Sequence, residues 1–410
     1  MPPSLGRHAA LLRTAAGFRQ LFVATLGSAV GTWMATIALT VDVKNRTGSA
    51  WWVSALLVVT LLPSVLVGLT AGPLIDRLSR KRLLVNADLS RLAVFAALPF
   101  VNSASAIVVL AGVAGVANSF FRPAVLAGLP NLVAEEELPR ATSLLQTADW
   151  SATALGPVVA GAIVGLSGPH VVYWINAATF LFSAAFLLRI PAPLLKSEQP
   201  ITRGHWRDLR EGMGEFRRSR PLLTALVALG LAVAGMGLVN VSEVFLATRV
   251  LHAGAFGYGL LWTASGLGLV AGSLLVGGVV ERRSPVASYP WMFLPWAAGG
   301  LGAALAPNIW VAAFAMVVSG IGNGVTFPTT VVIVQQAAAD RIRGRVFTVI
   351  ISAQNAVLGV AFAAAGGLTA AFGARWVYGA AAALVLAGGF SAFALTYRRP
   401  ARVELREQAA

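Results

Sequence analysis

The stretch GPLIDRLSRKR, residues 72–82, places five charged side chains within eleven residues of a chain that is otherwise poor in charge. Only 11% of the 410 residues are Asp, Glu, Lys or Arg, and 57% are hydrophobic. Apolar runs at 50–72 and 83–103 flank the stretch, and about 20 apolar residues in a helix suffice to cross a hydrocarbon core. The charged stretch is therefore expected to be a short loop between two membrane-spanning helices.

The alternation of apolar runs and charged breaks continues along the whole chain. Runs of this length predict helices, because transmembrane strands are about half as long and alternate in polarity. The N-terminal tail carries Arg7, Arg13 and Arg19 and leads straight into the first run, so no cleavable signal peptide is expected. The predicted fold class is all-α integral membrane, with twelve spans at 17–41, 50–72, 83–103, 105–128, 141–166, 171–190, 221–244, 256–280, 286–306, 308–334, 345–370 and 374–397.

The net charge of +15 is divided unevenly between the two predicted sides of the membrane. If the N-terminus is cytoplasmic, 27 of the 31 Lys and Arg residues lie on or near the cytoplasmic side. This bias predicts that both termini are cytoplasmic, and that the basic residues contact anionic membrane lipids rather than nucleic acid. The basic residues on the other side are Lys44, Arg46, Arg249 and Arg375.

The residue types exclude several classes of function. There is no cysteine, so disulfides and thiolate metal sites are impossible, and no cofactor is expected. No GxSxG, HExxH or Walker-type GxxxxGK motif is present, so the sequence indicates neither an enzyme nor direct use of ATP. A buried histidine relay is also excluded, because all four histidines fall in predicted tails or loops: His8, His170, His205 and His252.

An internal repeat becomes visible when the chain is shifted by 205 residues against itself. The shift lays NSFFRPAVL (118–126) over NGVTFPTTV (323–331), and GPLIDRLSR (72–80) over GGVVERRSP (277–285). Repeats of half the chain predict two matching six-helix bundles. The expected organisation is an N-terminal bundle, a cytoplasmic linker, a C-terminal bundle and a cytoplasmic tail, at 1–190, 191–220, 221–400 and 401–410.

The linker contains an amphipathic pattern, in which Trp206, Leu209, Met213 and Phe216 recur at helical spacing with arginines on the other face. This pattern favours a helix on the cytoplasmic membrane surface. A solvated tether is the alternative, because glycines at 212 and 214 lower helix propensity.

Two motifs, GPLIDRLSRKRLL (72–84) and ALGPVVAG (154–161), give the chain a resemblance to the major facilitator superfamily. The first is similar to the family's loop motif, with Ser79 where glycine is common, and the second is similar to a helix motif of its antiporters. The antiporter motif is partial, since Ala152 and Ala160 replace glycines, and an arginine motif of drug/proton antiporters is absent at Ala111. FRQLF, FFRPAVLAGLPNLV, ELPRATSL and GRVFT further resemble the enterobactin-exporter-like efflux branch. The antiporter-like motif consists of Gly156, Pro157 and Gly161.

The resemblance implies a conformational latch built on the loop motif. Asp76 is expected to face the N-terminus of the predicted helix at 345–370 when the cytoplasmic side is closed, where the helix dipole favours an acid. The alternative is that the basic residues serve only to orient the chain in the membrane. The expected latch residues are Gly72, Asp76, Arg77, Arg80 and Lys81, with Glu281, Arg140 and Arg345 from the repeat.

A few charged residues remain inside the predicted spans, where ionised side chains are costly. Asp149 is the leading candidate for a proton-coupling site, with Arg122 as its partner and Asp42 as the runner-up. The alternatives are a static ion pair for Asp149 and an outer-gate or solvated position for Asp42. Asp88 and Arg91 are expected to pair with the charged loop, and Glu243 is expected at the exterior rim.

The family resemblance implies a cavity between the two bundles. Its predicted polar content is modest, which suits hydrophobic or amphipathic cargo better than sugars. The tryptophans could instead pack in the core or against lipid, and the two repeat-related asparagines could join helices. The cavity candidates are Thr32, Trp33, Asn118, Trp150, Asn240, Trp262 and Asn323.

Together these features predict a secondary transporter that exports small hydrophobic or amphipathic compounds, such as a drug, siderophore or secondary metabolite, by proton antiport. There are two alternatives. One is an uptake or lipid-moving carrier of the same fold, and the other is a non-transporting membrane receptor. The use of 28 Arg against 3 Lys is typical of a GC-rich bacterial genome, and hence of a bacterial cytoplasmic membrane. A monomer is expected.

Overall fold

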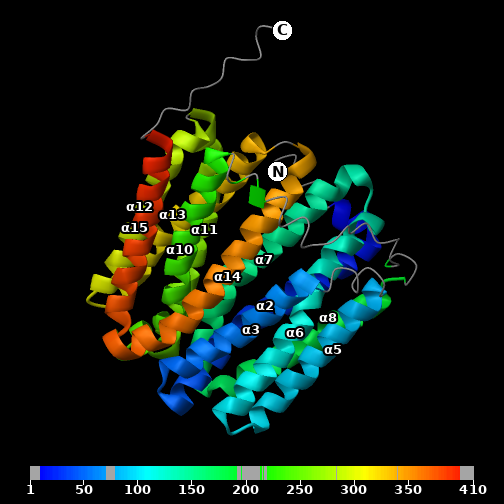
Figure 1. Cartoon of the computed structure of the whole chain (residues 1–410). Helices are drawn as coiled ribbons and strands as arrows, with labels where there is room; N and C mark the ends of the chain where they lie inside the picture. The colour runs from blue at the N-terminus through cyan, green and yellow to red at the C-terminus, as the bar shows by residue number, and fades with distance from the viewer. Residues whose placement is uncertain are drawn as a thin grey trace, which may run out of the picture.

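The computed structural model describes residues 10–70, 79–191, 195, 213–214, 216, 219–282, 284–338 and 340–397, and these residues form helices and short connections without any strand (Figure 1). Each predicted span overlaps one long helix, with ends that differ by up to six residues. The helices of the first half are α2 (Ala16–Thr47), α3 (Ala50–Thr70), α5 (Arg80–Ala97), α6 (Ala104–Gly128), α7 (Leu138–Ser167) and α8 (Pro169–Arg189). Those of the second half are α10 (Arg220–Phe245), α11 (Gly254–Arg282), α12 (Pro285–Leu305), α13 (Ile309–Ala337), α14 (Asp340–Phe372) and α15 (Ala374–Tyr397).

Eleven of the described helices are long and apolar enough to cross a membrane, and the twelfth, α12, is less apolar. The reason lies in its sequence, because α12 carries Pro290 and Pro295 within the helix and two tryptophans, Trp291 and Trp296. At 21 residues α12 equals α8 in length, and it packs against α13 and α15. The chain is a multi-pass membrane protein of all-α class.

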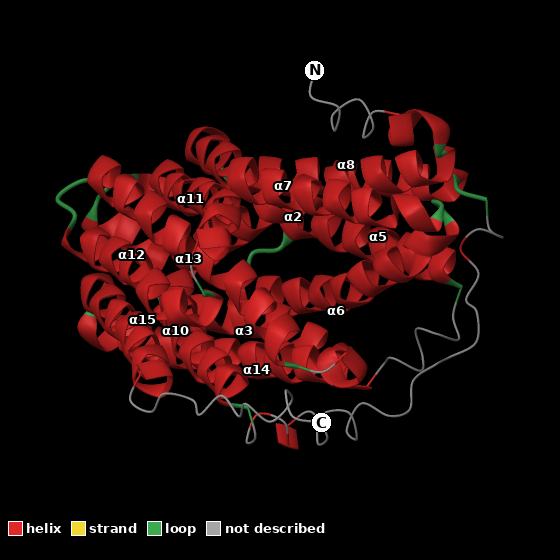
Figure 2. Ribbon diagram, turned by 90° about the horizontal axis from the view of Figure 1, so that it is seen from above, coloured by secondary structure: helices red, strands yellow, loops and turns green. Residues whose placement is uncertain are grey.

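The helices of each half pack mainly on one another. In the first half, α2 lies against α7 and α8, while α3 and α5 flank α6. In the second half, α10 lies against α14 and α15, and α13 lies between α11 and α12. Between the halves, α7 runs beside α11 and α14 crosses α3 (Figures 1 and 2).

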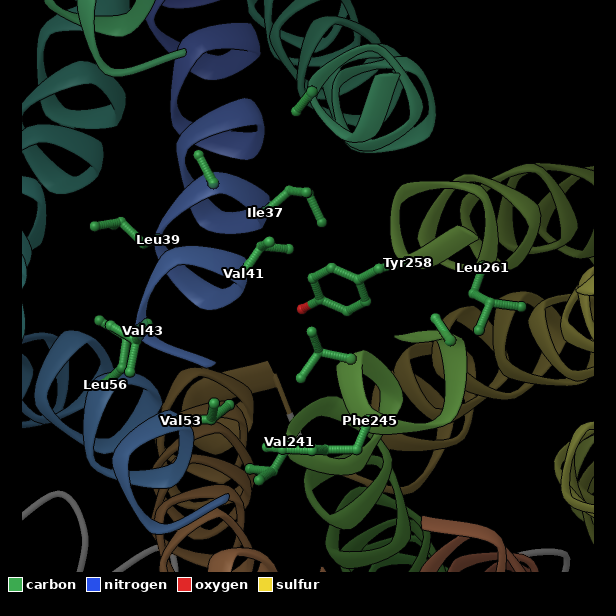
Figure 3. Packing of buried hydrophobic residues seen from close by; sticks show 14 of the residues in the cluster. Ile37, Leu39, Val41, Val43, Val53, Leu56, Val241, Phe245, Tyr258 and Leu261 are labelled. Atoms are coloured by element: carbon green, nitrogen blue, oxygen red, sulfur yellow. The ribbon is translucent and has the colours of Figure 1, made fainter. Parts of the chain in front are cut away.

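The halves meet at one end of the molecule, which we call the sealed end and which carries the turns at Gly48, Gly168, 251–253 and Gly373. A hydrophobic cluster there joins both halves, and Figure 3 shows Tyr258 of α11 reaching toward Val41 of α2. At the opposite, terminal end, where α2 begins and α15 ends, each described hydrophobic cluster belongs to a single half.

Close approach at the sealed end depends on glycine. A Cβ atom at Gly161 of α7 would lie 2.5 Å from the Ala255 carbonyl oxygen of α11, and one at Gly366 of α14 would lie 2.8 Å from Ser54 Cβ of α3. Only a residue without a side chain allows the helix backbones to come this close. Polar contacts add to the seal, since Arg249 Nη2 donates to the Gly48 carbonyl at 2.6 Å.

Most of the predicted linker lies outside the described residues. Of its apolar positions, Met213 is exposed and Phe216 is 2% exposed. Phe216 packs with Leu222 and Val346 in a cluster of the second half. Phe216 therefore contributes to the protein core, in contrast to the predicted position on a membrane surface.

Candidate functional site

A central cavity of about 370 Å³ lies between the two halves. Its walls come from α2 and α7 on one side and from five helices of the second half on the other, and apolar side chains dominate them. A second cavity of about 260 Å³ lies within the first half and shares Trp33 and Asp149 with the central one. Five predicted cavity residues line the central cavity, Trp33, Trp150, Asn240, Trp262 and Asn323, and two line the second, Thr32 and Asn118.

Asp149 lies near the middle of α7, at the junction of the two cavities. Its Oδ2 atom is 3.3 Å from Arg122 Nη1 of α6, and the two side chains are 34% and 69% exposed. A pair with this much exposure is weakly held, because water screens the charges. Asp149 can therefore exchange Arg122 for another partner without a large energetic penalty.

Asp42 lies near the sealed end of α2 and is 4% exposed. Its Oδ1 accepts from Arg46 Nε at 2.7 Å, and its Oδ2 accepts from the Tyr173 hydroxyl of α8 at 2.9 Å. Both carboxylate oxygens therefore have donors, and the arrangement fastens α2 to α8. This packing also explains why α2 continues to Thr47, six residues beyond the predicted end.

Asp88 and Arg91 pair with each other rather than with Arg80, Lys81 or Arg82, the basic residues of the charged loop that the structure describes, which contradicts the predicted pairing with that loop. Arg91 Nη2 lies 2.5 Å from Asp88 Oδ1, and Nη1 donates to Asn118 Oδ1 of α6 at 3.1 Å. The guanidinium carbon is 4.4 Å from the ring centroid of Phe121 and 4.3 Å from that of Phe180. Three helices thus enclose one arginine, a contact set that spacing along one helix cannot reveal.

Replacing Arg91 by leucine should destabilise the protein by ~3–5 kcal/mol, because it leaves the fully buried Asp88 without its cation. Thermal unfolding in detergent, followed by size-exclusion chromatography, measures the loss. Arg91→Lys is the matched control, since it keeps the charge and loses the two-pronged guanidinium contacts. Its melting temperature should fall between that of the parent and that of Arg91→Leu. A leucine variant as stable as the parent would contradict a structural role.

Glu243 of α10 lies in a different place from the one predicted. It is 2% exposed rather than at the exterior rim, it lines the central cavity, and its Oε1 atom has no hydrogen-bond partner among the described residues. The fully buried Tyr258 and Tyr378 lie close enough to interact with its charge. The helix continues after Glu243 as a π-helical turn to Val250, which keeps the carboxylate away from the loop.

Most latch residues lie outside the part of the chain that the structure describes or at its edges. Gly72, Asp76 and Arg77 are outside the described residues, and for Glu281 only the backbone is described. Three more lie at helix starts: Arg80 opens α5, Arg345 lies in the first turns of α14, and Arg140 of α7 pairs with Glu137. Lys81 donates to the carbonyl oxygens of Leu188 and Ile190, both at 2.7 Å, so it joins α5 to α8 within one half. The latch between the halves stays a prediction.

The antiporter-like motif lies where α7 meets its neighbours. A Cβ atom at Gly156 would lie 3.0 Å from Trp33 Cβ of α2, and the Pro157 carbonyl lies against Gly259 of α11. The backbone N–H of Val158 donates to Thr263 Oγ1 at 3.2 Å. The motif therefore places α7 closely against both α2 and α11.

These features define a class of protein: a membrane protein of two six-helix halves that enclose a shared cavity and meet at one end of it. The family model of the Major Facilitator Superfamily matches residues 21–250 and 227–410, and the chain belongs to this family. The matched relatives are transporters, and nothing in them points to an enzyme.

Two curated relatives are similar over much of the chain. An uncharacterized MFS-type transporter, YfiS of Bacillus subtilis (strain 168), is 27% identical over 367 residues, 86% of this chain and 87% of its own length. The enterobactin exporter EntS of Citrobacter koseri is 31% identical over 285 residues, 67% of this chain and 66% of its own length.

Two solved structures share the fold. A mutant of the nucleoside transporter NupG has a TM-score of 0.77 at 14% identity, covering 93% of this chain and 100% of that chain. A bacterial homologue of the iron transporter ferroportin, in its inward-facing state, has a TM-score of 0.72 at 14% identity, over 93% and 99%.

Proposed function

We propose that this protein is a proton-coupled exporter of small hydrophobic or amphipathic compounds across the bacterial cytoplasmic membrane. The observation that carries the proposal is the central cavity between the halves, whose wall is mostly apolar with a few amides, hydroxyls and carboxylates. Such a wall binds a cargo with a large apolar surface and few polar groups. The similarity to an enterobactin exporter favours export over uptake.

The mechanism that we propose is alternating access, in which the two halves rock around the central cavity. Contacts at the sealed end support this, because they are made by pairs of helices from different halves, α7 with α11 and α3 with α14. With the termini in the cytoplasm, as the basic residues predict, the sealed end faces the exterior. The structure then corresponds to the state that loads cargo from the cytoplasm.

Asp149 is the proton-coupling residue in this proposal. It reaches both cavities, and its pair with Arg122 is half exposed, so a proton or a cargo group can displace the arginine. Protonation releases Arg122 from the carboxylate, which links the charge state of the site to the packing of α6 against α7. An acid that alternates between an arginine and a proton is the simplest coupling device that this cavity offers.

Transport into inverted membrane vesicles tests the function. A proton gradient with the acidic side inside the vesicles should drive accumulation of at least one compound from a panel of lipophilic cations, siderophores and hydrophobic antibiotics. A protonophore should abolish this accumulation. Accumulation that occurs only in right-side-out vesicles, or that survives the protonophore, would overturn proton-coupled export.

The latch yields a separate prediction. Asp76→Asn should leave the amount of protein in the membrane unchanged and lower transport about threefold to tenfold, since an acid at a helix N-terminus contributes ~0.3–2 kcal/mol to one state. Initial rates of transport, normalised to protein, measure the effect. Arg82→Gln is the matched control, because it also removes one charge, from the first turn of α5 beside the same loop, and it should leave the rate near that of the parent. Equal rates for Asp76→Asn and the parent would exclude the latch.

A further inference from the structure

The described charged side chains that line the central cavity are all acidic. Its described lining contains two carboxylates, Asp149 and Glu243, and no Lys, Arg or His. The basic side chains Arg91 and Arg122 line the second cavity instead, where Arg91 pairs with Asp88 and Arg122 with Asp149. Negative charge at Glu243 is therefore not neutralised by any described protein cation.

Aromatic rings make up much of the same wall. Trp33 and Trp150 come from the first half, and Trp262, Trp296 and Tyr378 come from the second. The ring centroids of Trp33 and Trp262 are 5.6 Å apart, so an aromatic pair bridges the two halves. Indole faces attract organic cations and stack with aromatic groups, most strongly where water is excluded.

Glu243 is placed to anchor a positive group. It is 2% exposed and its Oε1 atom lacks a hydrogen-bond partner among the described residues, although it lies in the cavity wall. The titratable groups that face it are Tyr258 from α11 and Tyr378 from α15, and the other described helices against α10 present no charged group to it. An unpaired buried carboxylate is costly, so Glu243 must hold either a proton or a cation beside it.

We propose that the central cavity selects aromatic organic cations, and that Glu243 is the residue that binds their positive charge. Binding of a cation replaces the proton on the Glu243 carboxyl, which leaves to solvent, and the aromatic wall encloses the rest of the molecule. This inference rests on the proposed function in one respect, that the central cavity is the cargo site. It goes beyond that function because it specifies the charge of the cargo: the described lining offers a carboxylate to a cation and no basic side chain to an anion of the same size and shape.

Two probes of matched shape and opposite charge test the selectivity. Tetraphenylphosphonium and tetraphenylborate both present four phenyl rings, and their binding to the purified full-length protein in nanodiscs can be measured by equilibrium dialysis. Tetraphenylphosphonium should bind saturably, and its affinity should fall by up to about tenfold per pH unit as the pH falls, because protons compete for the same carboxylate. Tetraphenylborate should bind no more to the protein than to empty nanodiscs.

The variant Glu243→Gln should weaken tetraphenylphosphonium binding by about tenfold or more, since a charge-assisted contact is lost, and should reduce the proton release that accompanies binding. Glu135→Gln removes an exposed acid away from the cavity and should leave both quantities unchanged. If Glu243→Gln is not monodisperse, Glu243→Asp tests the same contact, because shortening the side chain moves the carboxylate away from the cavity. Unchanged affinity in either variant would overturn the proposal.

Failure of this inference is distinguishable from failure of the proposed function. Tetraphenylborate binding as tightly as tetraphenylphosphonium overturns cation selection, and proton-driven transport of another compound would still support export. Tetraphenylphosphonium that binds through Glu243, in a protein that transports nothing in vesicles, would support the cavity chemistry and contradict the transport function.

Discussion

Replacing Asp149 by asparagine should reduce proton-driven accumulation in inverted vesicles by about tenfold or more, since coupling energies between two sites are about 1–3 kcal/mol. Asparagine has nearly the shape of aspartate, but it cannot take up a proton at neutral pH. The variant therefore loses the exchange between proton and Arg122, while the cavity wall keeps its volume and its apolar character. Accumulation against a gradient should disappear first, because it depends on that exchange.

Cargo exchange separates this explanation from misfolding. With labelled cargo outside and unlabelled cargo inside, the Asp149→Asn variant should retain exchange near the parent rate, since exchange requires no net proton movement. Arg122→Gln should show the same loss of accumulation, because it removes the other half of the pair. Parent-like accumulation in Asp149→Asn would exclude this residue as the coupling site.

The substitution Gly259→Leu should lower transport by about a hundredfold. Overpacking costs about 1–3 kcal/mol, and here it destabilises only the state in which the sealed end is closed. In the structure the Pro157 carbonyl of α7 occupies the place where a side chain at Gly259 of α11 would begin. A leucine forces the two helices apart at the sealed end. The fold of each half should persist, because this contact joins the halves and does not hold either one together.

Labelling with a membrane-impermeant thiol reagent measures the shift directly. The chain contains no cysteine, so Asn240→Cys introduces one reporter into the central cavity. The additional Gly259→Leu change should increase labelling from the sealed end. Gly165→Leu is the matched control, because Gly165 lies on the same helix as Pro157 and has open space around its Cβ position. Equal labelling with and without leucine at 259 would show that the close contact does not control access.

The architecture could be predicted because it follows from local properties of the chain. Each span was visible as an apolar run, and the repeat at a shift of 205 residues indicated two halves. The helix ends differ by a few residues, as at α2, where Asp42 and Arg46 pair one turn apart and extend the helix past the apolar run. In lipid the backbone must form its own hydrogen bonds, so an apolar run of this length can only be a helix. The hydropathy pattern alone therefore predicts the secondary structure of the chain.

Among the site residues, hydropathy identified Asp149 because a carboxylate within an apolar run is conspicuous. The same rule should have identified Glu243, but its nearness to the predicted helix end suggested an exposed rim. Asp88 and Arg91 were visible as neighbours along the helix, whereas the rings of Phe121 and Phe180 that enclose Arg91 come from other helices. Contacts of this kind depend on how helices face each other, which hydropathy does not encode.

By itself the amino-acid sequence determined that this protein is a helical membrane protein of two repeated halves, because transfer of the backbone into lipid leaves one solution for apolar runs of this length. Only the tertiary structure showed that the Tyr173 hydroxyl of α8 also donates to Asp42, and that Glu243 is buried without a cation beside it among the described residues. The reason is physical. Burial and pairing are set by side chains that arrive from distant helices, and glycine contacts such as Gly259 with Pro157 fix how closely those helices approach.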